Sequence, residues 1–187
     1  AVDKTKMSKR SVFIHTFLSQ ELEYAQQLES INKVVVQPLI DASKGASLSP
    51  KLTRPQAQAI TADLQAGNVQ IFLRAAEALT LGVREFANGL ETLCEQAHWG
   101  DNFKLAAQFI SSSSRNLHTQ YKNYSGNHLQ TLRVLKSGHF TSYYRDCEDE
   151  LKDIPGSLAE KMDIPRNRPH AYQQFLQTLN SATQANH

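Results

Sequence analysis

The sequence predicts an all-α fold built as a bundle of long helices, for three reasons. Apolar residues recur at spacings of three and four along most of the chain, which is the period of a helix face. Glycine and proline, which interrupt helices, number only 8 and 6 among 187 residues. Nowhere do apolar and polar residues alternate with the period of two that is typical of a strand. Long helices of this kind bury their apolar stripes against one another as a bundle.

Length and composition indicate one domain. Apolar residues make up 40% of the chain and charged residues 20%, which suits a folded protein with a core. Residues 1–10 are expected to form a flexible polar head, and residues 11–187 the helical domain. The net charge of +2 is too small to indicate nucleic acid or an anionic membrane as a partner. No apolar run reaches the length of about 18 residues that a spanning helix needs, so no transmembrane segment is expected.

The first long helix follows the polar head. Pro38 and the Ser-, Gly- and Ala-rich residues 43–49 are expected to end it. A short helix begins at Thr53, with Pro55 in its first turn, and the Gly-Asn pair at 67–68 breaks it. The stripe of the first helix consists of Phe13, Phe17, Tyr24, Leu28, Ile31, Val35 and Leu39.

Two further long helices follow, separated by Gly100 as a stop and Asp101 as an N-cap. Gly126 is expected to interrupt the second of them. The stripes consist of Phe72, Ala75, Leu79, Val83, Phe86, Leu90 and Leu93 in one helix, and of Phe103, Ala107, Ile110, Leu117, Tyr121 and Tyr124 in the other.

The last part of the chain is divided by Gly138 and by the Pro-Gly pair at 155–156. Its final helical stretch contains two prolines. Of these, Pro169 is expected to start a new helix at the first position, with Asn167 or Arg168 as the cap.

The sequence contains no phosphate-binding glycine loop, no nucleophile elbow and no paired-histidine metal motif. Glu95 and His98 match one Glu-x-x-His element of a di-iron bundle, but the second element is missing, so His98 is interpreted as a helix-end residue. Cys94 and Cys147 are interpreted as buried free thiols of a reducing compartment, rather than as a bridge or a reactive thiol. The serine run at 111–114 indicates a closely packed polar helix face or, alternatively, a phosphorylation site. We therefore expect a protein that is not an enzyme, with no cofactor and no metal.

Residues 17–28 read Phe-Leu-Ser-Gln-Glu-Leu-Glu-Tyr-Ala-Gln-Gln-Leu, and Gln-Pro-Leu follows at residues 37–39. This pattern resembles the opening signature of the Dbl-homology domain, Leu-Leu-x-Thr-Glu-x-x-Tyr-x-x-x-Leu with a later Pro-Leu pair. Residues 165–179 read Pro-Arg-Asn-Arg-Pro-His-Ala-Tyr-Gln-Gln-Phe-Leu-Gln-Thr-Leu. They resemble the family's closing signature, Pro-x-Gln-Arg-x-x-x-Tyr-x-x-Leu-Leu-x-x-Leu, with Asn167 in place of Gln and Phe175 in place of Leu.

A third match lies between these two. Residues 117–127 are similar to the family's Tyr- and Asn-rich middle helix, and the three matches occur in the family's order. The resemblance covers about residues 11–180 and implies an elongated helical bundle of the Dbl-homology type.

The resemblance also implies a function without bond-making chemistry. A Dbl-homology domain is a guanine-nucleotide exchange factor, which binds a Rho-family small GTPase, prefers its nucleotide-free form and promotes GDP release. By linkage, the preference for the nucleotide-free form weakens nucleotide binding by the same factor. Such domains contact the two switch regions, displace Mg²⁺ and open the phosphate site.

The family also implies a setting for this chain. Its domains are cytoplasmic, are recruited to the inner face of the plasma membrane or to the cytoskeleton, and usually precede a membrane-directed pleckstrin-homology domain. They continue into a further helix, which this chain is expected to lack because it stops at His187.

Carried onto this sequence, the first and last signatures form one GTPase-binding face. Thr16 stands where the family typically has a Glu that holds the first switch, and Ala171 where it commonly has a Lys or Arg that reaches the second. For Arg168 there is an alternative, in which it holds neighbouring helices together through a carboxylate. The expected face comprises Thr16, Gln20, Glu23, Asn167, Arg168, His170, Ala171 and Gln174.

The substitutions at Thr16 and Ala171 motivate a second hypothesis, an exchange-impaired Dbl-homology scaffold or autoinhibitory binding module. A third hypothesis, an unrelated helical adaptor, predicts a bundle in which the first and last helices are not side by side.

Overall fold

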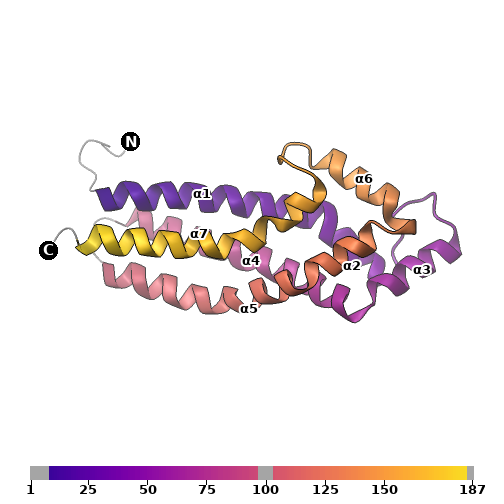
Figure 1. The fold of residues 1–187 in the computed structure, drawn as a ribbon, viewed down its shortest axis with the longest axis horizontal. Coiled ribbons are helices and arrows are strands. Elements are labelled where there is room, and N and C mark those ends of the chain that lie inside the picture. The colour runs from indigo at the N-terminus through magenta and orange to yellow at the C-terminus, as the bar shows by residue number, and fades with distance from the viewer. Residues whose placement is uncertain (1–8, 97–102, 185–187) are drawn as a thin grey trace.

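The computed structural model describes residues 9–96 and 103–184, and every element in these ranges is a helix (Figure 1). The predicted all-α class is therefore confirmed. In chain order the elements are α1 (Lys9–Ile31), the π-helix η2 (Asn32–Val36), α2 (Gln37–Ser43), α3 (Arg54–Leu64), α4 (Gly67–Glu95), α5 (Phe103–Leu135), the 3₁₀ turn η4 (Gly138–Phe140), α6 (Thr141–Glu150) and α7 (Leu158–Gln184).

The molecule is elongated, with α1, α4, α5 and α7 running along its long axis and α2, α3 and α6 gathered at one end (Figure 1). Helix α4 packs against α1 and α5, and α7 packs against the same two helices. The first and last helices are therefore neighbours although they are far apart in sequence. None of the described helices is both long and apolar enough to cross a bilayer.

The seam between α1 and α7 is aromatic. The rings of Phe17 and Phe175 stack with their centroids 3.8 Å apart, and Phe13 stacks on Phe175 at 5.3 Å. Such pairs add roughly 0.5–1.5 kcal/mol each beyond their buried area. They fix the separation and register of the two helices that carry the predicted binding face.

Helix α4 approaches α5 closely at a glycine. A Cβ atom at Gly89 would lie 2.5 Å from Cζ of Phe109, a separation that real Cβ atoms essentially never show. The absence of a side chain there lets Phe109 lie flat against Phe86, with centroids 5.6 Å apart. Phe86 in turn meets Tyr172 of α7 edge to face at 5.8 Å.

The prediction that Pro38 helps to end the first helix is wrong, whereas the predicted end at residues 43–49 is confirmed. Helices α1, η2 and α2 follow one another without a break to Ser43, and Pro38 lies in the first turn of α2. Because Pro38 has no N–H, the carbonyl of Val34 loses its helical donor, and the wider π turn accommodates the change. The Tyr143 hydroxyl on α6 lies 3.1 Å from the Val34 carbonyl oxygen and 2.7 Å from that of Val35. The Tyr143 hydroxyl thus reaches the Val34 carbonyl that Pro38 leaves without its helical donor, and makes its shorter contact with Val35.

The predicted start of α3 is confirmed. Thr53 precedes the helix in an extended conformation. Its backbone N–H and its hydroxyl both donate hydrogen bonds to Gln56 Oε1, each at 2.9 Å. The predicted breaks near Gly138 and residues 155–156 are also confirmed, since Gly138 and Gly156 adopt φ values of 37° and 94°.

Two predicted interruptions are wrong. Helix α5 passes through Gly126, which is exposed, and α7 contains both Pro165 and Pro169. Pro169 therefore starts no new helix, and Asn167 and Arg168 are helical residues rather than caps. Residues 1–8, which make up most of the predicted head, and the predicted stop and cap at residues 100–101 lie outside the described residues, as does His98. Helix α1 begins within the predicted head, at Lys9.

The four-serine run lies on α5. Ser111, Ser112 and Ser114 are exposed and only Ser113 is partly buried, so the expected close packing of this face is wrong.

Candidate functional site

The predicted face is formed by α1 and α7. Thr16, Gln20 and Glu23 follow one another at spacings of four and three on α1, and all three are exposed. On α7, His170 and Gln174 are exposed one turn apart. The two sets come together along an open groove of about 390 Å³ between the helices, lined by Gln20, Glu23, Tyr24, Gln27, Ile164, Asn167, Arg168 and Ala171.

Five of the eight predicted residues line this α1/α7 groove. They are Gln20, Glu23, Asn167, Arg168 and Ala171. The other three, which are Thr16, His170 and Gln174, are exposed on the same two helices but do not line it.

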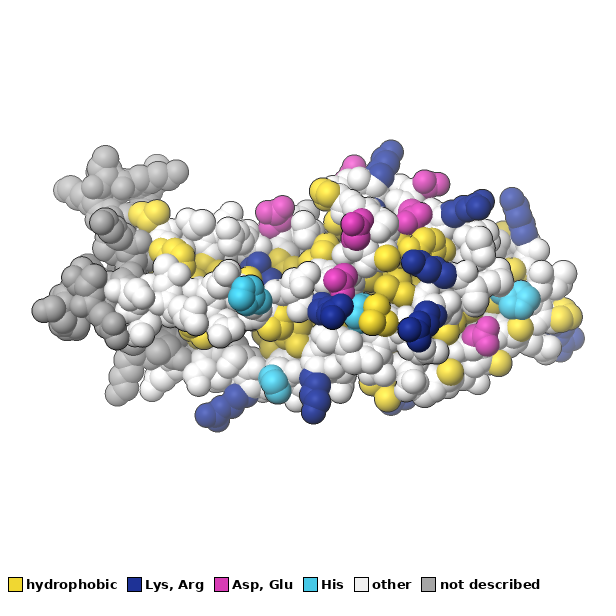
Figure 2. All heavy atoms as spheres, viewed as in Figure 1, with side chains coloured by type: hydrophobic (Ala, Val, Ile, Leu, Met, Phe, Trp, Pro, Cys, Tyr) yellow, Lys and Arg dark blue, Asp and Glu magenta, His cyan; other side chains and the backbone are white. Residues whose placement is uncertain are grey.

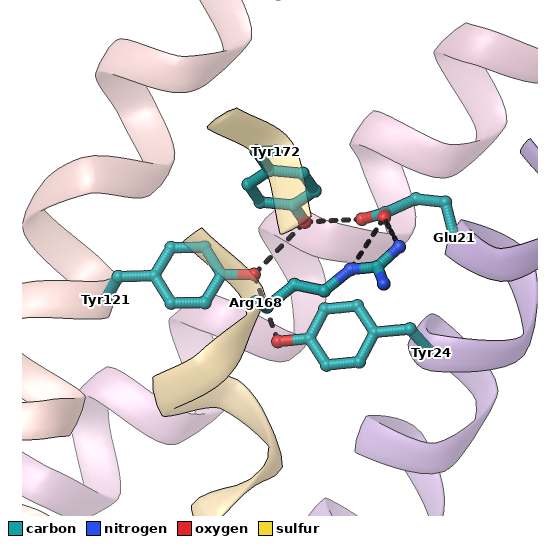
Figure 3. A network of polar contacts seen from close by, with 5 residues as sticks. All are labelled: Glu21, Tyr24, Tyr121, Arg168 and Tyr172. Carbon is teal, nitrogen blue, oxygen red and sulfur yellow. Dashed lines mark hydrogen bonds and ion pairs between the residues drawn. The ribbon is translucent and has the colours of Figure 1, made fainter. Parts of the chain in front are cut away.

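An ion pair between α1 and α7 forms part of the groove floor, because Arg168 lines the groove and pairs with the buried Glu21 (Figure 3). Glu21 has no exposed surface, and the Arg168 side chain is 15% exposed. The guanidinium donates to Glu21 Oε2 through Nε, at 3.1 Å, and through a terminal nitrogen. The Tyr172 hydroxyl donates to the other oxygen, Oε1, at 2.5 Å. The carboxylate therefore accepts three hydrogen bonds, all from α7.

A chain of hydroxyls ends on this carboxylate. The Tyr121 hydroxyl lies 3.1 Å from that of Tyr172, and the Tyr24 hydroxyl lies 3.0 Å from that of Tyr121 (Figure 3). Each hydroxyl has one proton, and Tyr172 gives its own to Glu21. Tyr121 must then donate to Tyr172, and Tyr24 to Tyr121. The direction of every bond is fixed, and the chain joins α1, α5 and α7.

Burial controls the ionisation of these groups. It raises the pKa of the Glu21 carboxyl, an effect that the Arg168 charge and the Tyr172 hydroxyl only partly offset. Burial alone would lower the pKa of Arg168, but the neighbouring Glu21 charge raises it, so the guanidinium stays charged. Burial also raises the pKa of Tyr24, Tyr121 and Tyr172 far above the ordinary value. All three hydroxyls therefore remain donors at any physiological pH.

Arg168 is held on its faces as well as by its hydrogen bonds. Its Cζ atom lies 4.9 Å from the ring centroid of Tyr24, 5.4 Å from Tyr172 and 5.7 Å from Phe17. Each distance is within the range of a cation–π contact. Arg168 therefore does what the alternative interpretation proposed, because it holds neighbouring helices together through a carboxylate.

The groove surface consequently presents little free charge. Its charged lining residues are Glu23 and Arg168, and Arg168 is neutralised by Glu21. The hydroxyl of Thr16 donates to the carbonyl of Val12 in its own helix, at 2.9 Å. In Figure 2, charged side chains of both signs gather over the end that carries α6, while the surface over the later turns of α7 is mostly uncharged.

Sequence reasoning missed Glu21, Tyr24, Tyr121 and Tyr172 as parts of this site. The signal for Glu21 was present, because Phe17, Glu21, Tyr24 and Leu28 are spaced by four, three and four, which places a carboxylate on the buried face of α1. A carboxylate at such a position needs a buried donor or a positive charge.

The described residues offer little for metal or nucleophilic chemistry. No three of their His, Cys, Asp and Glu side chains are placed to hold a metal ion. Cys147 is buried, Cys94 is half-buried, and both are free thiols, so the interpretation of both as buried holds fully only for Cys147. Burial raises the pKa of each thiol to about 11, which leaves little thiolate at neutral pH.

No protein-family model, curated protein or solved structure matches this chain.

Proposed function

We propose that this domain binds a Rho-family small GTPase through the α1/α7 face and promotes release of GDP. The observation that carries the proposal is the groove itself. Residues from the two Dbl-like signatures, which are about 150 positions apart in sequence, line one open surface together. The proposed partner is the nucleotide-free GTPase, and differential binding of that form is what accelerates nucleotide release.

The internal ion pair supports this proposal indirectly. A surface that distorts its partner must itself resist distortion, and the groove floor is held by Glu21, Arg168 and Tyr172. The elongated bundle with α1 beside α7 also lacks the separation of first and last helices that the unrelated-adaptor hypothesis predicts.

A second candidate function is a scaffold or autoinhibitory module that binds the GTPase without efficient exchange. Thr16 motivates it, because its hydroxyl is already bonded to Val12 and it has no carboxylate to hold the first switch. Ala171 offers only a methyl group at the edge of the groove.

The experiment is release of a fluorescent GDP analogue from a panel of Rho-family GTPases. It uses the 187-residue chain at micromolar concentration and, in parallel, a form extended beyond His187. Acceleration of release from at least one GTPase is expected. If neither form accelerates release, exchange is ruled out; retained binding of the nucleotide-depleted GTPase in the same samples then selects the scaffold.

Charge reversal tests which surface is used. Glu23→Lys changes the one charged groove side chain that is not neutralised by the buried ion pair, and it should lower the exchange rate at least about tenfold. Glu77→Lys makes the same charge change at an exposed position of α4 outside the groove and should leave the rate unchanged. Equal effects of the two substitutions would contradict use of the α1/α7 face.

A further inference from the structure

A second concave site lies on the other side of α7, between α7 and α5. It is a pocket of about 300 Å³ lined by residues of all four long helices. Its inner wall contains Phe17 from α1, Phe86 from α4, Tyr121 from α5, and Tyr172 and Phe175 from α7. Because rings from four helices converge, the pocket reaches the centre of the bundle rather than forming a shallow surface groove.

The mouth of this aromatic pocket combines polar and apolar side chains and is open to solvent. Ser114 and His118, one turn apart on α5, form one lip, and Pro169, Gln173 and Leu176 on α7 form the other. These five residues are exposed, and Figure 2 shows hydrophobic side chains visible in the gap between α7 and α5. The lining residues include neither Lys nor Arg and neither Asp nor Glu.

We propose that the aromatic pocket is a binding site for an uncharged small molecule with a flat ring system and one hydrogen-bonding group. The size fits such a ligand, since cavities of about 150 Å³ hold one benzene ring and small-molecule sites start near 300 Å³. Rings favour offset or edge-to-face contact with rings, which the five aromatic walls provide. The hydroxyl, amide and imidazole at the mouth provide donors and acceptors for a single polar group.

A partner helix fits the same place less well. Helix docking uses a row of apolar anchors along an extended groove. Among the described residues the large exposed apolar side chains are scattered, and only Leu176, at 44% exposure, borders the pocket. The others are Val12, Ile71, Leu81 and Leu129, none of which lines the pocket.

A ligand here would touch α7 at a sensitive point. Tyr172 contributes its ring to the pocket wall and its hydroxyl to Glu21 beneath the α1/α7 groove. Tyr172 therefore connects the pocket wall to the ion pair that supports the groove, although ligand binding itself does not depend on the proposed exchange activity.

The test is a titration of the ¹⁵N-labelled chain with 2-naphthol, followed by amide shifts in NMR spectra. Binding with a Kd below about 1 mM is expected, with the largest shifts in α5 and α7 around the pocket mouth. Naphthalene-2-sulfonate and 1-decanol are compared at the same concentrations, and both should bind more weakly. Tighter binding of the sulfonate or of decanol would overturn the assignment to an uncharged ring system.

Two substitutions locate the site. Ser114→Phe adds a ring at the lip and Ile110→Phe fills the inner wall, and each should raise the Kd of 2-naphthol at least about tenfold. Ser112→Phe is the matched control, because Ser112 is exposed on the same serine run and does not line the pocket. Loss of 2-naphthol binding in all three variants, or in none, would overturn the proposal.

Sedimentation velocity tests one other possible occupant of the pocket, a second copy of the chain. The wild-type chain should sediment as a monomer at the NMR concentration. A dimer that Ser114→Phe dissociates would assign the pocket to a self-interface and overturn the small-molecule assignment.

Discussion

The buried ion pair between Glu21 and Arg168 gives the sharpest prediction of stability. Glu21→Gln keeps the shape and the hydrogen bonds, since the amide oxygen can accept from Arg168 while the amide nitrogen donates to Tyr172. Tyr172 can then donate to Tyr121, which reverses the hydroxyl chain. The substitution therefore removes the negative charge beside a guanidinium that is only 15% exposed, and reversal of the chain leaves the proton of the Tyr24 hydroxyl with no acceptor among these five side chains.

Breaking a buried ion pair from one side costs up to about 3–5 kcal/mol, because the remaining charge has no partner, and the raised pKa of Glu21 offsets part of that cost, because the fold favours the uncharged carboxyl. With a urea m-value of about 2 kcal/mol/M, the unfolding midpoint of Glu21→Gln should fall by at most roughly 1.5–2.5 M. The measurement is urea unfolding at pH 7 followed by far-UV circular dichroism. A loss below about 1 kcal/mol would refute the reasoning from burial.

The pair Glu29–Arg84 is a matched control on the same helix. Its two hydrogen bonds are both 2.6 Å long, but its side chains are 42% and 30% exposed. Exposed pairs contribute only about 0–1 kcal/mol, so Glu29→Gln should cost about that little. If the two Gln substitutions cost the same, burial is not what makes the Glu21 pair sensitive.

Removing both charges of the buried pair should cost less than the two single changes together. Burial raises the pKa of Glu21 above its ordinary value of 4.5, so desolvation outweighs pairing and the pair as a whole adds little stability. Arg168→Met alone should also cost about 3–5 kcal/mol, and the double variant Glu21→Gln/Arg168→Met should recover at least about 2 kcal/mol of the summed losses. Additive losses would contradict direct coupling.

The sign of the pH dependence follows from the same shifts. A carboxyl whose folded pKa lies above its unfolded pKa loses stability as pH rises between the two values, which is the case of Glu21. Glu29 is the opposite case, because its hydrogen bond to Arg84 lowers its pKa, so its contribution is lost as pH falls through that lowered value. As pH rises through the range in which these carboxyls ionise, Glu21→Gln should therefore gain stability relative to the wild type, whereas Glu29→Gln should lose stability relative to it.

Three other predictions concern single sites. Tyr143→Phe should destabilise the fold by about 1–2 kcal/mol in urea unfolding, because the π turn loses the donor at the Val35 carbonyl; an unchanged midpoint would contradict this role. Gly126→Ala should raise the free energy of unfolding by about 0.5–1 kcal/mol, since nothing lies within 4 Å of the added Cβ, whereas Gly89→Ala should show no such gain. The alkylation rate of Cys94 by iodoacetamide should rise about tenfold per pH unit from pH 7 to 10, because its thiol pKa is about 11; a plateau near pH 8 would contradict a raised pKa.

The helices were predictable from sequence because their apolar stripes are long. Helix α4 buries the stripe residues from Phe72 to Leu90, and α5 buries those from Ile110 to Tyr124. The start of α3 follows from Thr53 and its capping box. Short signals were less reliable. A glycine costs a helix about 1 kcal/mol, so Gly126 is easily carried by the packing of a 33-residue helix.

The prolines were misread for a related reason. A proline inside a helix costs about 3 kcal/mol, which packing against other elements can offset. At Pro38 the offset includes a hydroxyl from α6, more than 100 residues later in the chain, and no local pattern reveals it. Helix α7 contains Pro165 and Pro169 between the buried Met162 and Phe175, which anchor it on both sides of the prolines.

The sequence predicted several of the residues that line the candidate site, but not all of the buried groups that hold its two helices together. Gln20, Glu23, Asn167 and Ala171 line the groove as expected. For Arg168 the sequence offered pairing with a carboxylate as an alternative, but it did not identify Glu21 as that carboxylate. Pairing between positions 147 residues apart depends on how α7 is rotated against α1, and periodicity within one helix does not define that rotation.

The burial of Glu21 also allows a measurement that distinguishes nucleotide exchange from scaffold binding. Glu21 has no exposed surface, so Glu21→Gln touches no partner directly and acts only through the rigidity of the α1/α7 groove. If exchange requires a rigid face that distorts the GTPase, this variant should slow nucleotide release more than it weakens binding of the nucleotide-depleted form, because distortion is needed only for release. A scaffold needs binding alone, and for it the two measurements should change together or not at all. Glu21→Gln therefore tests whether the rigidity of the α1/α7 groove contributes to nucleotide release.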